Sequence, residues 1–242
     1  MIEVVIHHTC ASSHKLYSAL KGKPIKWTPA TISHLRAMAL GIPAVYADGR
    51  LVLVDPVKPE DVEALLAGRN EGGLGVEEAV ENFAAGVLYN QSLLSLALLH
   101  KSFKPLLDRE LVEVLTRARY RGRLEAAGEA ARAIAERDAE LFAENYERMV
   151  KAAAYGLVRE LYWLGLRPGD VDEKYAALWL LAKATVGRIG LQFPRPGVDK
   201  RVAADLAAVL RERGDSYYAR IEEEQRAIAS DADFMSLFHG VE

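Results

Sequence analysis

A change of sequence pattern near residue 70 is the feature that most constrains the fold of this chain. Before it, short runs rich in β-branched residues alternate with short helical patterns. After it, apolar residues recur at helical spacing through long stretches rich in alanine, leucine, glutamate and arginine. Four glycines between residues 68 and 75 are typical of a linker. The sequence therefore predicts two domains, 1–68 and 76–242, joined by a Gly-rich linker at 69–75.

The first domain is predicted to be an α/β fold with the element order β-α-β-α-β-β-α and a mixed four-stranded sheet. Asp48-Gly49 lies between two β-rich runs, and this pair favours a tight hairpin turn because its residues accept positive φ. The expected elements, in chain order, are a strand at 2–7, a helix capped by Ser12 or Ser13 and ending near Leu20, a strand at 25–27, a helix from Thr28-Pro29 to Ala39, strands at 43–46 and 51–54, and a helix that begins at Pro59.

The second domain is predicted to be all-α, with about six helices that bury a core of their own. One long helix is expected from Leu124 past Ala152, and Gly214 is expected to end the helix before the last one. No strand is expected after the linker.

Four arginines alternate along the second domain, at positions 117, 119, 121 and 123. A spacing of two residues does not align side chains on one helix face. Neighbouring acidic residues, among them Glu110 and Glu113, can neutralise the arginines. The sequence therefore predicts a solvated surface here and not a site for phosphate or RNA.

Composition narrows the class of protein. The chain has 242 residues, a formal net charge of −3 and one cysteine. An internal disulfide and a Cys-rich zinc site are excluded, and no broad attraction to nucleic acid or to an anionic membrane is expected. No apolar run approaches the roughly 18 residues of a membrane helix, and the first residues do not resemble a secretory signal. We expect a cytoplasmic protein, and the few Asn and Gln residues are typical of a thermophile.

The position of the cysteine, together with its neighbouring residues, resembles the arrangement in a known superfamily. Cys10-Ala11-Ser12-Ser13 follows an apolar strand, and Ile42-Pro43 precedes the hairpin about thirty residues later. This arrangement resembles the thioredoxin-like superfamily, and in size it is closest to glutaredoxin. The resemblance covers residues 1–68 and gives a CxxS, or monothiol, form of the family motif. A small domain of this kind before an all-helical domain is also similar to the layout of the glutathione transferases.

The resemblance implies the residues of a site. Cys10 would be the nucleophile and Ser13 would stand at the second position of the motif, although Ser13 cannot resolve a mixed disulfide. The family's cis-proline corresponds to Pro43, which would present the backbone of Ile42 to a thiol-bearing ligand. A cysteine at a helix N-terminus also faces unpaired N–H groups, which favour the thiolate.

Other polar side chains surround this motif and leave alternatives open. Thr9 and Ser12 can donate hydrogen bonds to a bound thiolate or serve only in capping. His8 and His14 can assist the thiolate, or they are structural. A metal site is not expected, because His7 and His8 are adjacent on a strand and point to opposite faces.

The sequence predicts thiol-disulfide exchange or thiol transfer through Cys10, at a cleft between the domains. One alternative is a non-catalytic docking protein or a homodimerising scaffold, because a resolving cysteine is missing. A second is a glutathione-transferase-like enzyme, although Val54-Asp55-Pro56 stands where those enzymes carry a Glu-Ser pair. A low-molecular-weight thiol stays open as a cofactor, and the expected partner is a thiol or disulfide substrate, or another protein.

Overall fold

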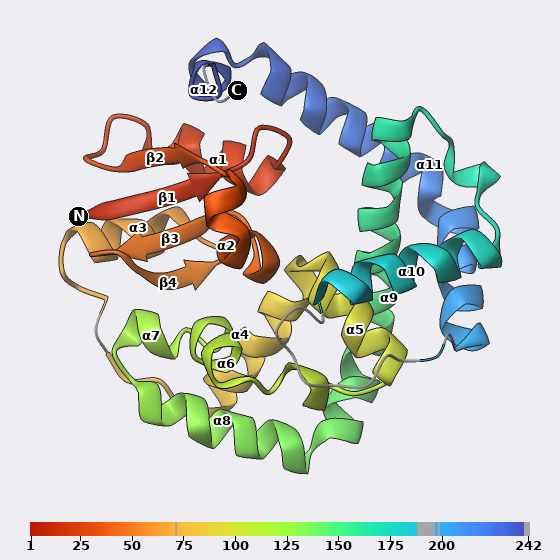
Figure 1. Ribbon diagram of the computed structural model, residues 1–242, viewed down its shortest axis with the longest axis horizontal. Coiled ribbons are helices and arrows are strands. Elements are labelled where there is room, and N and C mark those ends of the chain that lie inside the picture. The colour runs from red at the N-terminus through yellow and green to blue at the C-terminus, as the bar shows by residue number, and fades with distance from the viewer. Residues whose placement is uncertain (71, 188–196, 198, 240–242) are drawn as a thin grey trace. The chain divides into compact units, whose positions relative to one another are not determined.

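The computed structural model describes residues 1–70, 72–187, 197 and 199–239 (Figure 1). By its contacts the chain forms two compact units. Unit 1 combines residues 1–86, 109–131 and 224–242, and unit 2 combines residues 87–108 and 132–223. Each unit is therefore assembled from separated stretches of sequence.

Unit 1 contains a mixed four-stranded sheet with the strand order β2-β1-β3-β4 (Figure 1). β1 pairs in parallel with β2 and antiparallel with β3, which pairs antiparallel with β4. Asp48 and Gly49 join the last two strands with φ of 49° and 77°, as the hairpin prediction requires. The strands are β1 (Ile2–Ile6), β2 (Lys26–Pro29), β3 (Ala44–Ala47) and β4 (Arg50–Val54).

The predicted element order of the first 66 residues is confirmed. Between and after the strands lie α1 (Ala11–Leu20), a 3-10 turn η1 (Ile32–His34), α2 (Leu35–Leu40) and α3 (Pro59–Leu66). The expected helix start at Thr28-Pro29 is wrong, because both residues pair with β1 as the end of β2. Thr31 caps the following turn, accepting a hydrogen bond from the backbone of His34, whose ring accepts one from the Thr31 N–H in return.

Distant segments of the chain complete the core of unit 1. The apolar cluster on one side of the sheet includes Tyr120, Ile228 and Phe234 together with residues of β1, α1 and β4. Arg117 donates two hydrogen bonds to the carboxylate of Asp61 in α3 and a third to the carbonyl of Pro56. The added elements are α6 (Arg109–Leu115), α7 (Ala118–Arg121), the end of α11 (Lys200–Ser230) and α12 (Ala232–Ser236).

The prediction of about six helices after the linker is wrong, because the described residues contain α4 to α12. Asn90 caps α5 with its side chain and so separates it from α4. The long helix expected from Leu124 ends at Glu136, and a new helix begins at Asp138, whose carboxylate accepts hydrogen bonds from Ser102 and Phe103. The elements not yet given are α4 (Val76–Tyr89), α5 (Gln91–His100), the turn η2 (Lys104–Leu106), α8 (Leu124–Glu136), α9 (Asp138–Leu164), the turn η3 (Pro168–Asp170) and α10 (Glu173–Gly187).

Gly214 does not end a helix, because α11 continues through it. A Cβ at this position would lie 2.4 Å from the side chain of Pro168, so glycine allows η3 to pack against the helix. The glycine that was interpreted as a helix end therefore marks a position where η3 lies close to α11, within unit 2.

Over the described residues, no single helix is both long and apolar enough to cross a membrane, and only the bent pair α4–α5 reaches that length and composition together.

Candidate functional site

Cys10 lies at the junction between β1 and α1. It is the N-cap residue of α1, with φ −91° and ψ 115°, and its side chain is partly buried. The N–H groups of the first turn point toward this position, and no acidic residue lies in that turn. A negative charge on the sulfur would therefore be stabilised by the helix N-terminus.

The helix begins earlier than expected, because neither Ser12 nor Ser13 is its cap. Cys10 holds the N-cap position without a side-chain hydrogen bond to the helix. Its thiol instead donates a hydrogen bond to the carbonyl oxygen of Ile42, with a distance of 3.4 Å between Sγ and O.

The peptide bond between Ile42 and Pro43 is cis, as the family resemblance implies. Gly41 precedes it with φ of 136°, and a Cβ there would contact Val54 and the backbone of Asp55 at 3.5 Å. The glycine thus lets the loop lie against the end of β4. The structure brings together Cys10, Ile42 and Pro43, three of the residues that the sequence placed in one site.

Ser13 and Thr9 serve a neighbouring histidine. Ser13 is fully buried, and its hydroxyl accepts a hydrogen bond from the backbone N–H of His7 at 3.3 Å. The Thr9 hydroxyl lies 3.0 Å from Nδ1 of His7, which also accepts from the Thr9 N–H. Ser12 is partly buried. The hydroxyls of Thr9 and Ser13 therefore order the loop before α1.

The histidines of this region have distinct surroundings. Burial, followed by the charge of His8, lowers the pKa of His7, and the bonds to its Nδ1 fit a neutral ring with its proton on Nε2. His8 stacks on His7 and lies edge-on to Phe238. The expectation that His7 and His8 point to opposite faces of a strand is therefore wrong, because β1 ends at Ile6. His14 points to the C-terminal segment, where its Nε2 lies 3.0 Å from Oδ2 of Asp231. The assistance that His8 and His14 would give to the thiolate stays a prediction.

Sequence reasoning missed the contribution of the C-terminal segment, residues 224–238. Gln225 is buried and donates from Nε2 to the carbonyl oxygen of Thr9 at 3.0 Å. Asp231 caps α12, accepting from the N–H of Phe234, and this bond is the main reason that its pKa is lowered. The ring of Phe234 is fully buried against Tyr17. One signal was visible in the sequence, a glutamine at an apolar position of the last helical stripe.

The C-terminal segment thus contacts the chain on both sides of Cys10, at Thr9 and at His14. Within the described part of the chain, no three His, Cys, Asp or Glu side chains gather as metal ligands would.

The first half of the arginine-rich stretch is not the solvated surface that the sequence predicted, whereas Arg123 is 52% exposed. The side chains of Arg117 and Arg119 are 16% and 24% exposed and are held by Asp61, Glu110 and Glu113. The expected neutralisation by Glu110 and Glu113 is confirmed. Exposure was misjudged because the stretch packs on β4 and α3, which lie far away in the sequence.

The chain matches no protein-family model, no curated protein and no solved structure. The fold and the site therefore stand on the geometry alone. They define unit 1 as a small mixed four-stranded sheet with helices, and the remainder of the chain is largely helical. At the end of the sheet a single cysteine, a helix N-terminus and a cis-proline loop come together.

Proposed function

We propose that this chain is a monothiol thioredoxin-like protein that exchanges thiols with disulfides through Cys10. The observation that carries the proposal is the contact between the Cys10 thiol and the carbonyl of Ile42, next to a cis Pro43. A ligand chain bonded to the sulfur would lie beside this carbonyl and the backbone around it. The helix N-terminus supports the thiolate, which is the reactive form of cysteine.

The reaction needs one disulfide and one thiol from outside the chain. The Cys10 thiolate attacks one sulfur of a substrate disulfide, and the other sulfur leaves as a thiolate that takes up a proton. The product is a mixed disulfide on Cys10. Because the chain has no second cysteine and Ser13 is buried, an external thiol must then attack the mixed disulfide and release Cys10. A low-molecular-weight thiol suits this role.

The reaction of reduced protein with bis(2-hydroxyethyl) disulfide tests the proposal, with the mixed disulfide followed by intact mass. The same chain in urea supplies the matched control, since it offers the same thiol without the fold. We expect the folded protein to react at least about tenfold faster at neutral pH, because the helix N-terminus increases the thiolate fraction. Ser13→Ala should keep the rate and Cys10→Ser should form no adduct.

A folded protein that reacts no faster than the unfolded chain would contradict the exchange proposal. It would favour the second candidate function, a non-catalytic docking module. The observation behind this candidate is the C-terminal segment, which contacts Thr9 and His14 on either side of Cys10. Chromatography on immobilised glutathione tests the transferase-like alternative, which requires retention of the chain through a bound thiol.

A further inference from the structure

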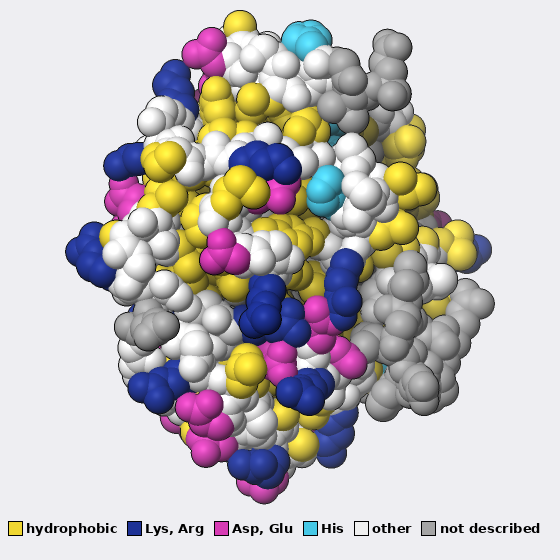
Figure 2. Space-filling model, turned by 60° about the vertical axis from the view of Figure 1, so that its left-hand side comes forward, with side chains coloured by type: hydrophobic (Ala, Val, Ile, Leu, Met, Phe, Trp, Pro, Cys, Tyr) yellow, Lys and Arg dark blue, Asp and Glu magenta, His cyan; other side chains and the backbone are white. Residues whose placement is uncertain are grey.

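A hollow in unit 1, away from Cys10, is lined by charged side chains. It has a volume of about 730 Å³, within the range of small-molecule sites, and it is bordered by α2, the β3–β4 hairpin and the stretch from α6 to α8. Figure 2 shows basic and acidic side chains gathered side by side next to hydrophobic surface. The polar residues of this charged hollow are Arg36, Tyr46, Arg50, Glu110, Glu113 and Arg119.

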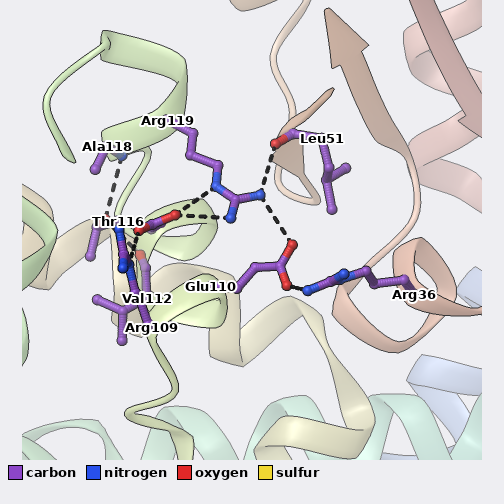
Figure 3. Close-up of polar contacts among 9 residues, drawn as sticks. Arg36, Leu51, Arg109, Glu110, Val112, Thr116, Ala118 and Arg119 are labelled. Carbon is purple, nitrogen blue, oxygen red and sulfur yellow. Dashed lines mark hydrogen bonds and ion pairs between the residues drawn. The ribbon is translucent and has the colours of Figure 1, made fainter. Parts of the chain in front are cut away.

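The guanidinium group of Arg119 is hydrogen-bonded to other groups of the protein. It donates to both carboxylates of the hollow, with Nε 2.9 Å from Glu113 and Nη1 3.1 Å from Glu110 (Figure 3). A further contact reaches the carbonyl oxygen of Leu51 at 3.5 Å. With three partners inside the protein, this side chain has little donor capacity left for a ligand.

The two carboxylates are also occupied. Glu113 accepts from Arg109 as well as from Arg119, and Glu110 pairs with Arg36 as well as with Arg119. Burial would raise the pKa of Glu113, but the hydrogen bonds from the two arginines outweigh it and lower this pKa. Glu113 is therefore ionised at neutral pH, and both carboxylates are already paired, which leaves them poor partners for a ligand cation.

The hydrogen-bonding groups of the hollow that remain available to a ligand are donors. Arg50 is exposed and makes no ion pair with any residue that the structure describes, and Arg36 uses one terminal nitrogen on Glu110. Burial raises the pKa of Tyr46, so its hydroxyl stays protonated and can donate. The hollow has three guanidinium groups against two carboxylates, an excess of one positive charge.

We propose that the charged hollow binds a small organic anion, whose phosphate or carboxylate group is held by Arg50 and Arg36. Guanidinium groups bind both kinds of oxyanion through paired N–H donors. The ring of Tyr46 and the side chain of Leu124 supply apolar surface for the rest of the molecule. This site is independent of Cys10 and of the thiol chemistry proposed above.

Isothermal titration of the full chain tests the site with two probes, AMP for a phosphate and citrate for carboxylates, at constant ionic strength. The decisive variant is Arg50→Ala, and its matched control is Arg69→Ala, which removes the same charge from an exposed position outside the hollow. We expect Arg50→Ala to weaken binding at least about tenfold and Arg69→Ala less than about twofold. Tyr46→Phe should weaken it by a smaller factor.

The stronger probe distinguishes a phosphate ligand from a carboxylate ligand, and either result supports the site. Absence of binding by both probes would overturn the proposal. Equal weakening by the two arginine variants would overturn it as well, because the attraction would then be a general charge effect. Thermal unfolding of Arg50→Ala, an exposed position, checks that the fold is kept.

Discussion

The Cys10 end of unit 1 and the charged hollow lie in the same compact unit but are built from different interactions. At Cys10 the contacts are mainly between neutral groups, such as the thiol on Ile42, the amide of Gln225 on Thr9 and the buried ring of Phe234. In the hollow, arginines and glutamates alternate in a connected set of ion pairs. The stability of the Cys10 end should therefore depend on apolar burial. The stability of the charged hollow should depend on charge and on pH.

The largest effect is expected from Phe234→Ala. The ring is fully buried against Tyr17 and His14, and its removal should lower the free energy of unfolding by about 3–5 kcal/mol. Urea denaturation measures the loss, with Ser236→Ala on the exposed side of the same short helix as control. A loss below about 1 kcal/mol would mean that the C-terminal segment is not part of this core.

Glu113→Gln tests how much charge contributes to stability in the charged hollow. The carboxylate accepts charged hydrogen bonds from two arginines, so we expect a loss of about 2 kcal/mol in the free energy of unfolding at neutral pH. Because the pKa of Glu113 is lowered in the folded protein, its stabilising contribution is complete above the unfolded value near 4.3. The contribution disappears as the pH falls through the folded value.

The difference between wild type and Glu113→Gln should therefore shrink as the pH falls below the unfolded value near 4.3, and it should vanish below the folded value, where both side chains are neutral. Thermal unfolding over a series of pH values measures it. The exposed pair of Glu125 and Arg123 supplies the control, since Glu125→Gln should change stability by less than about 0.5 kcal/mol. A difference for Glu113→Gln that does not vary with pH would show that charge is not what the position contributes.

The smallest effect is expected from Gln225→Ala. It removes one hydrogen bond to the carbonyl of Thr9 and should cost about 1 kcal/mol in the free energy of unfolding. The reaction of Cys10 with a disulfide gives a second measurement on the same variant. We expect it to accelerate, because the segment beside the thiol loses an attachment. A slower reaction would instead indicate that Gln225 holds Cys10 in its reactive position.

Local patterns in the sequence were enough to predict the strands and the hairpin. The β-rich runs and the Asp48-Gly49 turn gave the order of the strands along the chain, because these features depend on short-range geometry that the residues specify directly. The proximity of Cys10 to Pro43 was implied by the family resemblance, and the contact between Cys10 and Ile42 agrees with it. The error at Thr28 has the opposite cause, because pairing with β1 outweighed a good local helix-start signal.

The long-range features could not be predicted in the same way. Nothing in the residues around Tyr120 or Phe234 shows that they pack into the core of the first seventy residues. The arginines at 117 and 119 look like surface residues until Asp61 and Leu51 are placed beside them. Breaks between helices were missed for a related reason, since Asp138 binds Ser102 and Phe103, more than thirty residues earlier.

The assembly of unit 1 from three stretches has a consequence for how the protein is made. A nascent chain that has reached the glycines after α3 already carries every strand, but Tyr120, Ile228 and Phe234 have not yet been synthesised. The apolar side of the sheet and α1 stay incompletely covered until the chain has been synthesised beyond Phe234 and this residue has left the ribosome. Expression of the first seventy-five residues alone should accordingly give a product that aggregates, whereas a circular permutant that joins residues 224–242 to the start of the chain should shorten the wait.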